Sequence, residues 1–308
     1  MAAKELADHL LSVRFTILLV LLGLAVIGTV YAAASGIRDV APEATGVPAL
    51  FLRLFTIAPE QRVPPFFALV GFLAPLLGIA FGFDAVNSER AEGTLPRLLS
   101  QPIHRDDVIN GKFTAGLAVI SLILAAITVL VAGIGLVRLG IVPSAGEVAR
   151  LLAWLVVAII YVGFWLAFST LLSVLVRRAA TAALVAITAW LVLTLFFGLL
   201  VGLLADTLAP VPAQATAPEL LRNAQLELSL ARLSPNTLYE EATVVLLDPE
   251  VRTVGILLPQ QIDRAVRSSL SFDQSLLLIW PQMVGLIALT IISFAVAYIV
   301  FMRQEVRA

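Results

Sequence analysis

The chain has 308 residues and a formal net charge of −1, with 60% hydrophobic and 13% charged residues. A charge this close to zero indicates neither a nucleic-acid-binding surface nor a polybasic lipid anchor. The absence of cysteine excludes disulfides, thiolate metal ligands and cysteine nucleophiles.

Six long apolar runs contain no Asp, Glu, Lys, Arg or His. They cover residues 15–34, 66–83, 113–137, 151–176, 179–205 and 275–302. Each meets the roughly 17 to 25 residues that a helix rising about 1.5 Å per residue needs to cross hydrocarbon. The runs are apolar on every side, whereas helices of a soluble protein carry a polar stripe. The sequence therefore predicts an all-α integral membrane protein with six transmembrane helices, of which 15–205 hold the first five and 275–308 the sixth with a tail.

Residues 1–14 precede the first run. Leu6, Leu10 and Val13 recur at i, i+4 and i+7, which predicts an amphipathic helix lying at the membrane surface. A frayed tail is the alternative for so short a segment. The acidic Glu5 and Asp8, with no small-residue cleavage site after the run, favour a retained span over a signal peptide.

Six spans place both ends of the chain on one side. Lys and Arg are denser in the short segments on that side, which predicts that both termini are cytoplasmic and that the protein lies in the cell membrane. On the outer side, residues 35–65 contain an apolar patch that we expect to dip into the membrane interface. The patch consists of Phe51, Leu52, Leu54 and Phe55.

Residues 206–274 are too long for a bare connector, and we expect a small helical extracytoplasmic domain there. Thr216 and Glu219 form a capping box with Pro218 in the first turn, which predicts the start of a helix. Ser234 and the following Pro begin a second helix that ends at Asp248. A third amphipathic piece is expected near 262–270. Pro281 then predicts a kink in the last span.

Several kinds of chemistry are missing from the sequence. The runs hold no charged group that would mark an ion path or a proton relay. Gly111 and Lys112 do not form a nucleotide-binding loop, because Asp106 occupies the place of the first Gly and Phe113 that of Ser or Thr. His9 and His104 have no metal-ligand spacing. We therefore expect a chain that is not an enzyme by itself and binds neither metal nor cofactor.

The charged segment 84–112 joins the second and third runs on the inner side. On a helical wheel its apolar and charged residues separate onto opposite faces, as for Ala91, Leu95, Leu98 and Leu99 against Glu89, Arg90, Glu92 and Arg97. This pattern predicts an in-plane helix that offers a polar face to a soluble partner. The alternative is that the segment is polar only because it is an inner loop.

The order of residues in this segment is similar to that of one known family. The residues are Asp84, Glu89-Arg90, Gly93-Thr94-Leu95, Leu98-Leu99, Pro102, Arg105 and Gly111-Lys112. This order resembles the loop between spans two and three of ABC-2-type transporter permeases. Residues 233–242 are similar to the outer segment of the subfamily that includes the nitrous-oxide-reductase maturation and gliding-motility permeases.

The resemblance implies a permease subunit that pairs with a second copy and with two separate ATP-binding subunits, which would carry ATP and Mg. It implies that 89–99 is a coupling helix inserted into the ATPase, and that Arg105 and Lys112 position the loop at lipid headgroups. The implied coupling residues are Glu89, Arg90, Gly93, Thr94, Leu98, Leu99, Pro102, Arg105 and Lys112. Pro96 should bend or divide this helix after Thr94.

Two further patterns leave alternatives open. Gly78 with Gly82, and Gly198 with Gly202, allow close helix approach either at a dimer seam or within one subunit. Some aromatic residues are candidates for lining a substrate route, with interfacial anchoring as the alternative. They are Trp154, Tyr161, Trp165, Trp190, Phe196 and Phe197.

The leading functional hypothesis is ATP-driven export of an amphipathic or lipid-like substrate along an apolar path. The rival is a mechanical or maturation complex that transmits force to a periplasmic partner at 206–274 with no transport. An ion-coupled carrier or channel is the third hypothesis, and the lack of charges in the spans disfavours it.

Overall fold

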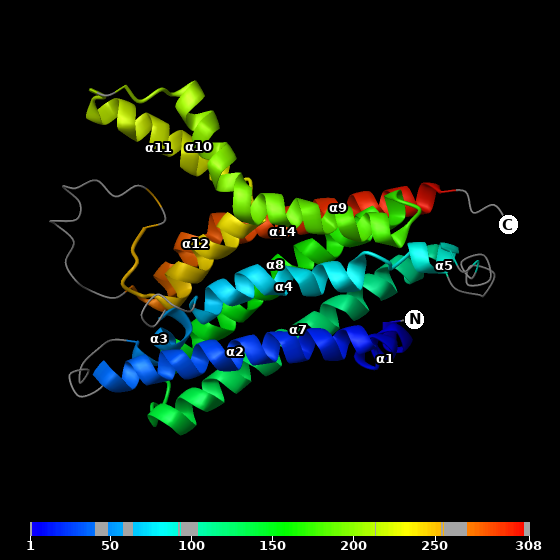
Figure 1. Cartoon of the computed structure of the whole chain (residues 1–308), viewed down its shortest axis with the longest axis horizontal. Coiled ribbons are helices and arrows are strands. Elements are labelled where there is room, and N and C mark those ends of the chain that lie inside the picture. Colours follow the sequence, from blue (N-terminus) through cyan, green and yellow to red (C-terminus); the bar gives the residue numbers. More distant parts are fainter. Residues whose placement is uncertain are drawn as a thin grey trace.

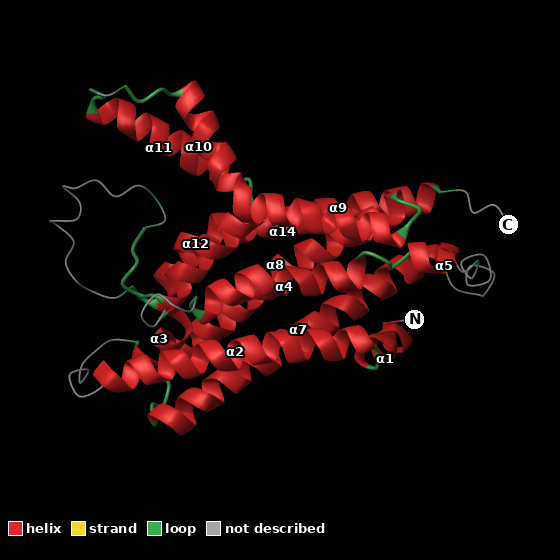
Figure 2. Ribbon diagram, viewed as in Figure 1, coloured by secondary structure: helices red, strands yellow, loops and turns green. Residues whose placement is uncertain are grey.

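The computed structural model describes residues 2–40, 49–57, 64–91, 93, 104–212, 214–253, 255 and 270–304. Within these ranges all regular structure is helical (Figure 2). Six segments are long and apolar enough to cross a membrane, namely Val13–Ser35, Phe66–Ala91, Arg105–Leu139, Ala145–Leu175, Ala179–Leu208 and Phe272–Arg303. They contain the six predicted runs almost completely, so the prediction of a six-span helical membrane protein is confirmed.

The helices follow one another along the chain. Their bounds are α1 (Ala2–Leu10), α2 (Val13–Val40), α3 (Leu50–Thr56), α4 (Phe66–Gly82), α5 (Asn87–Ala91), α7 (Arg105–Leu139), α8 (Ala145–Leu175), α9 (Ala179–Leu191), the π-helical segment η3 (Val192–Phe196), α10 (Phe197–Leu208), α11 (Ala217–Ala231), α12 (Pro235–Leu247) and α14 (Phe272–Arg303). α1, α5 and the end of α14 lie at one end of the bundle (Figure 1). We call this end the terminal face and the opposite end, near α3, the far face.

α8 lies at the centre of the bundle and packs against α4, α7, α12 and α14. α4 approaches α8 closely because two of its residues have no side chain. A Cβ on Gly78 would lie 2.6 Å from the carbonyl oxygen of Val162, and one on Gly82 would lie 2.8 Å from that of Leu166. The first pair of small residues therefore packs helices within one subunit.

The aromatic residues of α8 fill this core. Trp154, Tyr161 and Trp165 are completely buried among side chains of the same subunit. Trp190 is buried against the ring of Phe72, at 4.9 Å between centroids. In contrast, Phe196 is exposed on the outside of the bundle. The buried rings hold the helices of one subunit together.

The apolar patch of α3 is buried rather than placed in the membrane interface as expected. Its four residues Phe51, Leu52, Leu54 and Phe55 are almost inaccessible. The ring of Phe55 lies 5.3 Å from that of Phe66 and 6.3 Å from that of Trp154. α3 packs onto the far face because the aromatic residues of α4 and α8 bury its side chains more completely than the membrane interface would.

α1 forms a separate short helix, as the sequence predicts, and it packs against α7. Leu6 and Leu10 contact the core, whereas Val13 already belongs to α2 and is exposed. The chain bends between the two helices, where the Ser12 hydroxyl donates to the carbonyl oxygen of His9 at 2.7 Å. The apolar face of α1 is therefore shorter than the predicted one.

The fifth span changes direction at η3, since a π-helical turn inserts an extra residue and bends the helix axis. Beyond it, α10 and α11 form a hairpin that projects from the bundle (Figure 1). α11 begins after the predicted capping box, in which the Thr216 backbone N–H donates to Glu219 Oε2 at 2.7 Å. The sixth span, α14, runs unbroken through Pro281.

α12 corrects the expectation that 206–274 form one outer domain. It runs from Pro235 to Leu247 with Ser234 and Asp248 as its cap residues, close to the predicted bounds, but it lies in the bundle against α4, α8 and α14. The apolar face of α12 is buried there, because the apolar surfaces of α8 and α14 cover it. Its buried residues are Leu238, Ala242, Val245 and Leu246. Residues 262–269 of the third predicted piece lie outside the described residues.

Candidate functional site at the terminal face

The start of the charged segment is fixed to α8 by one hydroxyl group. Ser173 Oγ accepts hydrogen bonds from the backbone N–H groups of Val86, at 2.9 Å, and Asn87, at 3.2 Å, and donates to Asn87 Oδ1 at 2.8 Å. Ser173 and Asn87 are completely buried. Because buried polar groups need partners, these three bonds hold α5 against the end of α8.

A cluster of opposite charges joins α5 to α1 and α7. Lys112 Nζ lies 2.7 Å from Glu89 Oε1 and 3.1 Å from Glu5 Oε1. The three side chains are only 10%, 16% and 12% exposed, in that order. Solvent screens such partly buried pairs much less than surface pairs. One ammonium group therefore connects three helices, and we call these residues the Lys112 cluster.

Gln304, at the end of α14, connects a further set of helices. Its Oε1 accepts a hydrogen bond from Arg90 Nη2, and its backbone carbonyl accepts one from Arg105 Nη1 at 3.1 Å. Gln304 Nε2 donates to the carbonyl oxygen of Val174 at 2.9 Å. α5, the start of α7, the end of α8 and the end of α14 consequently meet at one residue.

The junction of α1 with the spans adds an ion pair and a ring contact. Arg14 Nη1 forms a salt bridge with Asp84 Oδ2, and its guanidinium lies 5.2 Å from the ring centroid of Phe83. The imidazole of His9 packs edge-on against Phe81, with 5.0 Å between ring centroids. Burial there lowers the pKa of His9 below its ordinary value, Lys112 lowers it further, and Glu5 opposes both.

The structure describes five of the nine residues that the resemblance assigned to coupling. It brings Glu89 and Lys112 together and joins both Arg90 and Arg105 to Gln304. Gly93 has a φ of +67°, a left-handed conformation that favours glycine, with open space around its Cα. Lys112 is enclosed by carboxylates, which leaves it little surface for a lipid headgroup. The other four, Thr94, Leu98, Leu99 and Pro102, lie outside the described residues.

Sequence reasoning did not identify Glu5, Ser173 or Gln304 as parts of this site. Each lies far along the chain from the segment 84–112, and each contacts it only through the fold. The one local feature that could have indicated a contact was the position of Glu5 on the polar side of α1. Nothing in the local sequence distinguishes Ser173 from the other hydroxyl residues of the spans.

A polar cluster on α12 was also missed, because its charges lie outside the apolar runs. Glu241 Oε2 lies 3.0 Å from Arg232 Nε and accepts a hydrogen bond from Gln282 Nε2 at 2.7 Å. Gln282 belongs to the sixth span and is 2% exposed. α12 therefore brings a carboxylate into contact with the sixth span, although none of the six apolar runs contains a charged residue.

Arg150 holds the other end of α12 at the far face. It is 5% exposed, and its guanidinium donates to Ser275 Oγ at 2.9 Å and to the carbonyl oxygen of Leu246 at 3.3 Å. It also donates to the carbonyl oxygen of Leu270. A cation is favourable at the last carbonyls of a helix, which have no partner within the helix.

Six apolar helices, with α8 at their centre and the start of the charged segment fixed after span two, define a multi-pass membrane protein. The chain belongs to the family described as ABC-2 family transporter protein, whose model matches residues 1–306. It is similar to the probable ABC transporter permease protein NosY of Stutzerimonas stutzeri, with 29% identity over 209 residues, 64% of this chain and 67% of NosY. The protein is thus a membrane permease subunit of an ABC transporter, and the ATPase is a separate subunit.

Proposed function

We propose that two copies of a separate ATPase dock on the terminal face, and that their ATP-driven closure moves the spans and exports an amphipathic or lipid-like substrate. The observation that carries this proposal is the set of bonds around α5. Glu89 links α5 to α1 and α7 through Lys112, Asn87 links it to α8 through Ser173, and Arg90 links it to α14 through Gln304. A displacement of α5 is therefore passed to several helices at once.

The close packing of α4 on α8 supports the same proposal. Gly78 and Gly82 bring α4 so close to α8 that an added Cβ would lie 2.6 Å and 2.8 Å from its carbonyl oxygens, so we expect the two helices to move together. α5 follows directly from α4, and it is also fixed to the end of α8. A push on α5 then moves α4 and α8 as one unit.

To test coupling, the permease is assembled with its ATPase in lipid vesicles, and ATP hydrolysis is compared with that of the ATPase alone. Glu89→Ala and Arg90→Ala should abolish most of the stimulation by the permease. Arg222→Ala serves as the control, because this exposed residue lies on α11, far from α5. Unchanged stimulation and assembly in both α5 variants would show that these residues have no part in coupling.

Orientation follows from the same proposal, with the terminal face in the cytoplasm. The chain contains no cysteine, so a single introduced thiol reports its own side of the membrane. In intact cells, a membrane-impermeant maleimide should label Ser229→Cys on α11 and leave Arg177→Cys, between α8 and α9, unlabelled until the cells are opened. The reverse pattern would place the ATPase site outside the cell and overturn the proposal.

A second copy of the chain is part of the proposed assembly. Only 17% of the most apolar stretch is buried in each of spans five and six, against 61% in span four. On α10, Gly198 has no atom within 4 Å of a Cβ, and Leu199 and Leu203 are exposed. Such a surface with small residues permits close approach of another helix. Leu203→Cys should form a cross-linked dimer under oxidation, with Leu122→Cys on α7 as the control.

The projecting hairpin of α10 and α11 favours a second candidate function, which is the transmission of force to a periplasmic protein without transport. α11 exposes Arg222 and Gln225 on a helix that extends beyond the bundle. The double variant Arg222→Glu and Gln225→Lys should lose such a partner while ATPase stimulation persists. Deletion of the whole segment 210–270 is a poor test, because it also removes the buried α12.

A further inference from the structure

Two adjacent carboxylates on α12 have different environments. Glu241 lies 3.0 Å from Arg232 Nε and accepts a hydrogen bond from Gln282 Nε2, so its charge has a basic partner. Glu240 has one side-chain contact in the part of the chain that the structure describes, in which its Oε1 accepts a hydrogen bond from Asn236 Nδ2 at 2.9 Å. Its side chain is exposed on the surface of the subunit. Glu240 is therefore a carboxylate without a basic partner among the described residues.

The contacts of α12 with α8 place Glu240 inside the apolar part of the membrane. Asn236 Oδ1 lies 3.1 Å from the hydroxyl of Tyr161, whereas the carbonyl oxygen of Leu246 lies 3.3 Å from Arg150 Nη1. The two helices are thus antiparallel, and Glu240 lies one turn from Asn236 towards the far face. At roughly 1.5 Å per residue, this position is about 9 Å inside the apolar run 151–176.

The contacts of α12 with α14 give the same depth. Gln282 is bonded to Glu241, the residue after Glu240, and at roughly 1.5 Å per residue it lies about 10 Å inside the apolar run 275–302. The hydrocarbon of a bilayer is about 30 Å thick. Both spans therefore put Glu240 below the headgroups and within the hydrocarbon layer.

A carboxylate at this depth requires a polar surrounding. A charged side chain at the centre of a span costs about 2.5–3.5 kcal/mol on insertion scales, and such groups normally face a water-filled cavity or a partner of opposite charge. The six apolar runs contain no Lys, Arg or His, so the spans of a second copy offer no basic partner at this level. Glu240 accordingly faces a hydrated space in the assembled transporter and not the lipid.

The orientation of the Glu240 carboxylate is fixed from the core of the bundle. The hydroxyl of the completely buried Tyr161 lies 3.1 Å from Asn236 Oδ1 and 3.0 Å from the carbonyl oxygen of Gly71. Because Asn236 Oδ1 faces this hydroxyl, its Nδ2 points to Glu240 Oε1. One carboxylate oxygen is thus held in place, and Oε2 is available to a ligand.

The surroundings of α12 have too few hydrogen-bond donors. Gln282 Oε1 is buried and accepts no hydrogen bond within the described residues. This acceptor belongs to the side chain that is bonded to Glu241, next to Glu240. A carboxylate without a basic partner and a buried acceptor without a donor both favour a ligand that brings donors and positive charge.

From these observations we infer that Glu240 lines the substrate route and binds the cationic group of an amphipathic substrate, such as an ammonium group, through Oε2. The inference rests on the proposed export function, because it names the class of substrate. An anionic headgroup at the same place would be repelled by the carboxylate. The preferred substrate is therefore an amphipathic cation.

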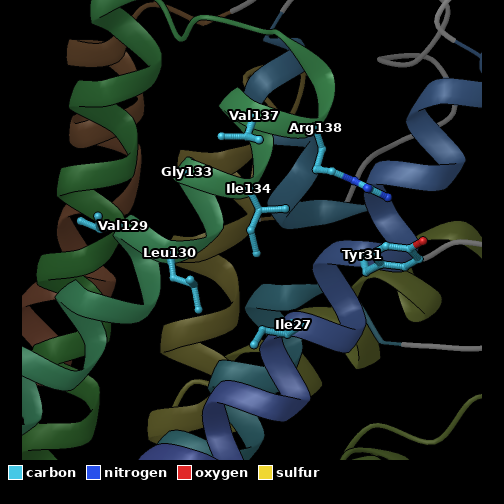
Figure 3. Close-up of a pocket in the computed structure, with 8 residues that line it drawn as sticks. All are labelled: Ile27, Tyr31, Val129, Leu130, Gly133, Ile134, Val137 and Arg138. Atoms are coloured by element: carbon cyan, nitrogen blue, oxygen red, sulfur yellow. The ribbon is translucent and has the colours of Figure 1, made fainter.

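A second hollow at membrane depth selects no class of ligand. This groove of about 590 Å³ lies between α2 and α7, and Figure 3 shows Tyr31 and Arg138 at one end and aliphatic side chains along the rest. The guanidinium carbon of Arg138 lies 4.8 Å from the ring centroid of Tyr31. An apolar wall of this kind accepts any hydrocarbon chain, so the charge of Glu240 is the more specific feature.

The first test asks whether water reaches Glu240. The natural chain has no cysteine, so a single introduced thiol can be followed in the purified full-length permease in lipid nanodiscs. A thiol reacts as the thiolate, which forms in water and not in hydrocarbon. Glu240→Cys should therefore react with a water-soluble, positively charged methanethiosulfonate. Leu122→Cys is the control, because Leu122 is exposed near the middle of α7, and it should stay unreactive.

The second test measures binding of a lipophilic cation in the same nanodiscs. Tetraphenylphosphonium is compared with tetraphenylborate, an anion of similar size and shape, and empty nanodiscs give the background. The wild type should bind the cation above this background and not the anion. Glu240→Gln keeps the shape of the side chain and should weaken cation binding by about tenfold, because one ion pair in a poorly solvated site is lost. Glu227→Gln makes the same charge change on exposed α11 and should have no effect.

Each variant is accepted only if its circular dichroism and gel filtration match the wild type. An unreactive Glu240→Cys would show that this face of α12 contacts lipid and would overturn the inference. Equal binding of the cation by the wild type and Glu240→Gln would do the same, as would no cation binding by the wild type. Neither test needs the ATPase, so failure here is distinct from failure of the coupling proposal.

Discussion

Lys112 Nζ on α7 lies 2.7 Å from Glu89 Oε1 on α5, and 3.1 Å from Glu5 Oε1 on α1. One positive charge therefore holds two carboxylates in a site that solvent reaches only slightly. Without the ammonium group, these carboxylates would face one another in a poorly hydrated place. Lys112 is therefore the residue that joins α1, α5 and α7 at the terminal face.

Replacement of this residue should be costly. Lys112→Met removes the ammonium group that pairs with both Glu5 and Glu89, and we expect it to lower the free energy of unfolding by about 2–4 kcal/mol. The double variant Lys112→Met with Glu89→Gln should be less destabilised, because one of the two negative charges is removed. Thermal unfolding of the purified permease in detergent measures both. Strictly additive losses would mean that the Lys112 cluster contributes no coupling energy.

Arg150 should be as important at the far face. Arg150→Met leaves Ser275 Oγ and the last carbonyl groups of α12 without their charged donor, which should cost about 3 kcal/mol. Limited proteolysis should then cut α12 faster than in the wild type. Arg177→Met is the matched control, because this exposed arginine should change stability by less than about 0.5 kcal/mol. Equal protease resistance of the two variants would contradict the role of Arg150.

The glycines of α4 and α7 should respond in opposite directions to the same substitution. Gly78→Ala forces a Cβ to within 2.6 Å of a backbone oxygen of α8, so the two helices must separate. Gly133→Ala meets open space and should stabilise α7 by about 0.5–1 kcal/mol, as alanine loses less entropy in a helix. Chemical unfolding in mixed micelles distinguishes them. A stabilised Gly78→Ala would show that α4 and α8 are not in rigid contact.

Docking of α1 should weaken in acid. Burial against Phe81 lowers the pKa of His9 below 6.5, so the undocked helix takes up a proton first as the pH falls. The contribution of His9 to docking is therefore complete above pH 6.5 and is lost as the pH falls through 6.5 towards the lower docked value. Hydrogen exchange of residues 2–10, corrected for intrinsic rates, should rise between about pH 7.5 and 5.5. His9→Gln should remove this dependence, and a persisting dependence would assign it to other groups.

The sequence was sufficient for elements that depend on local composition. The six spans follow from runs without charge, and the starts of α11 and α12 follow from capping residues at Thr216 and Ser234. These features need only the nearest residues along the chain, since length, hydropathy and backbone capping are local properties.

The position of α12 in the bundle could not be predicted from local sequence. Nor could the residues that contact the charged segment at the terminal face. The periodicity of α12 identifies its apolar face but not the surface that covers it, and the surfaces of α8 and α14 become available only in three dimensions. Lys112 was chosen because of a resemblance between loops, whereas its partner Glu5 lies on another helix. Glu241 looked like an outer-domain residue until the fold brought it to Gln282.

The position of α12 also sets an order of events during translation. α12 leaves the ribosome before α14, yet Gln282 and Ser275 of α14 complete the bonds of Glu241 and Arg150. In a nascent chain that stops before residue 270, α12 can contact α4 and α8, but Glu241 and Arg150 still lack these two partners on α14. The last span therefore completes the polar contacts of α12, and the bundle is fully closed only when this carboxyl-terminal helix has been inserted.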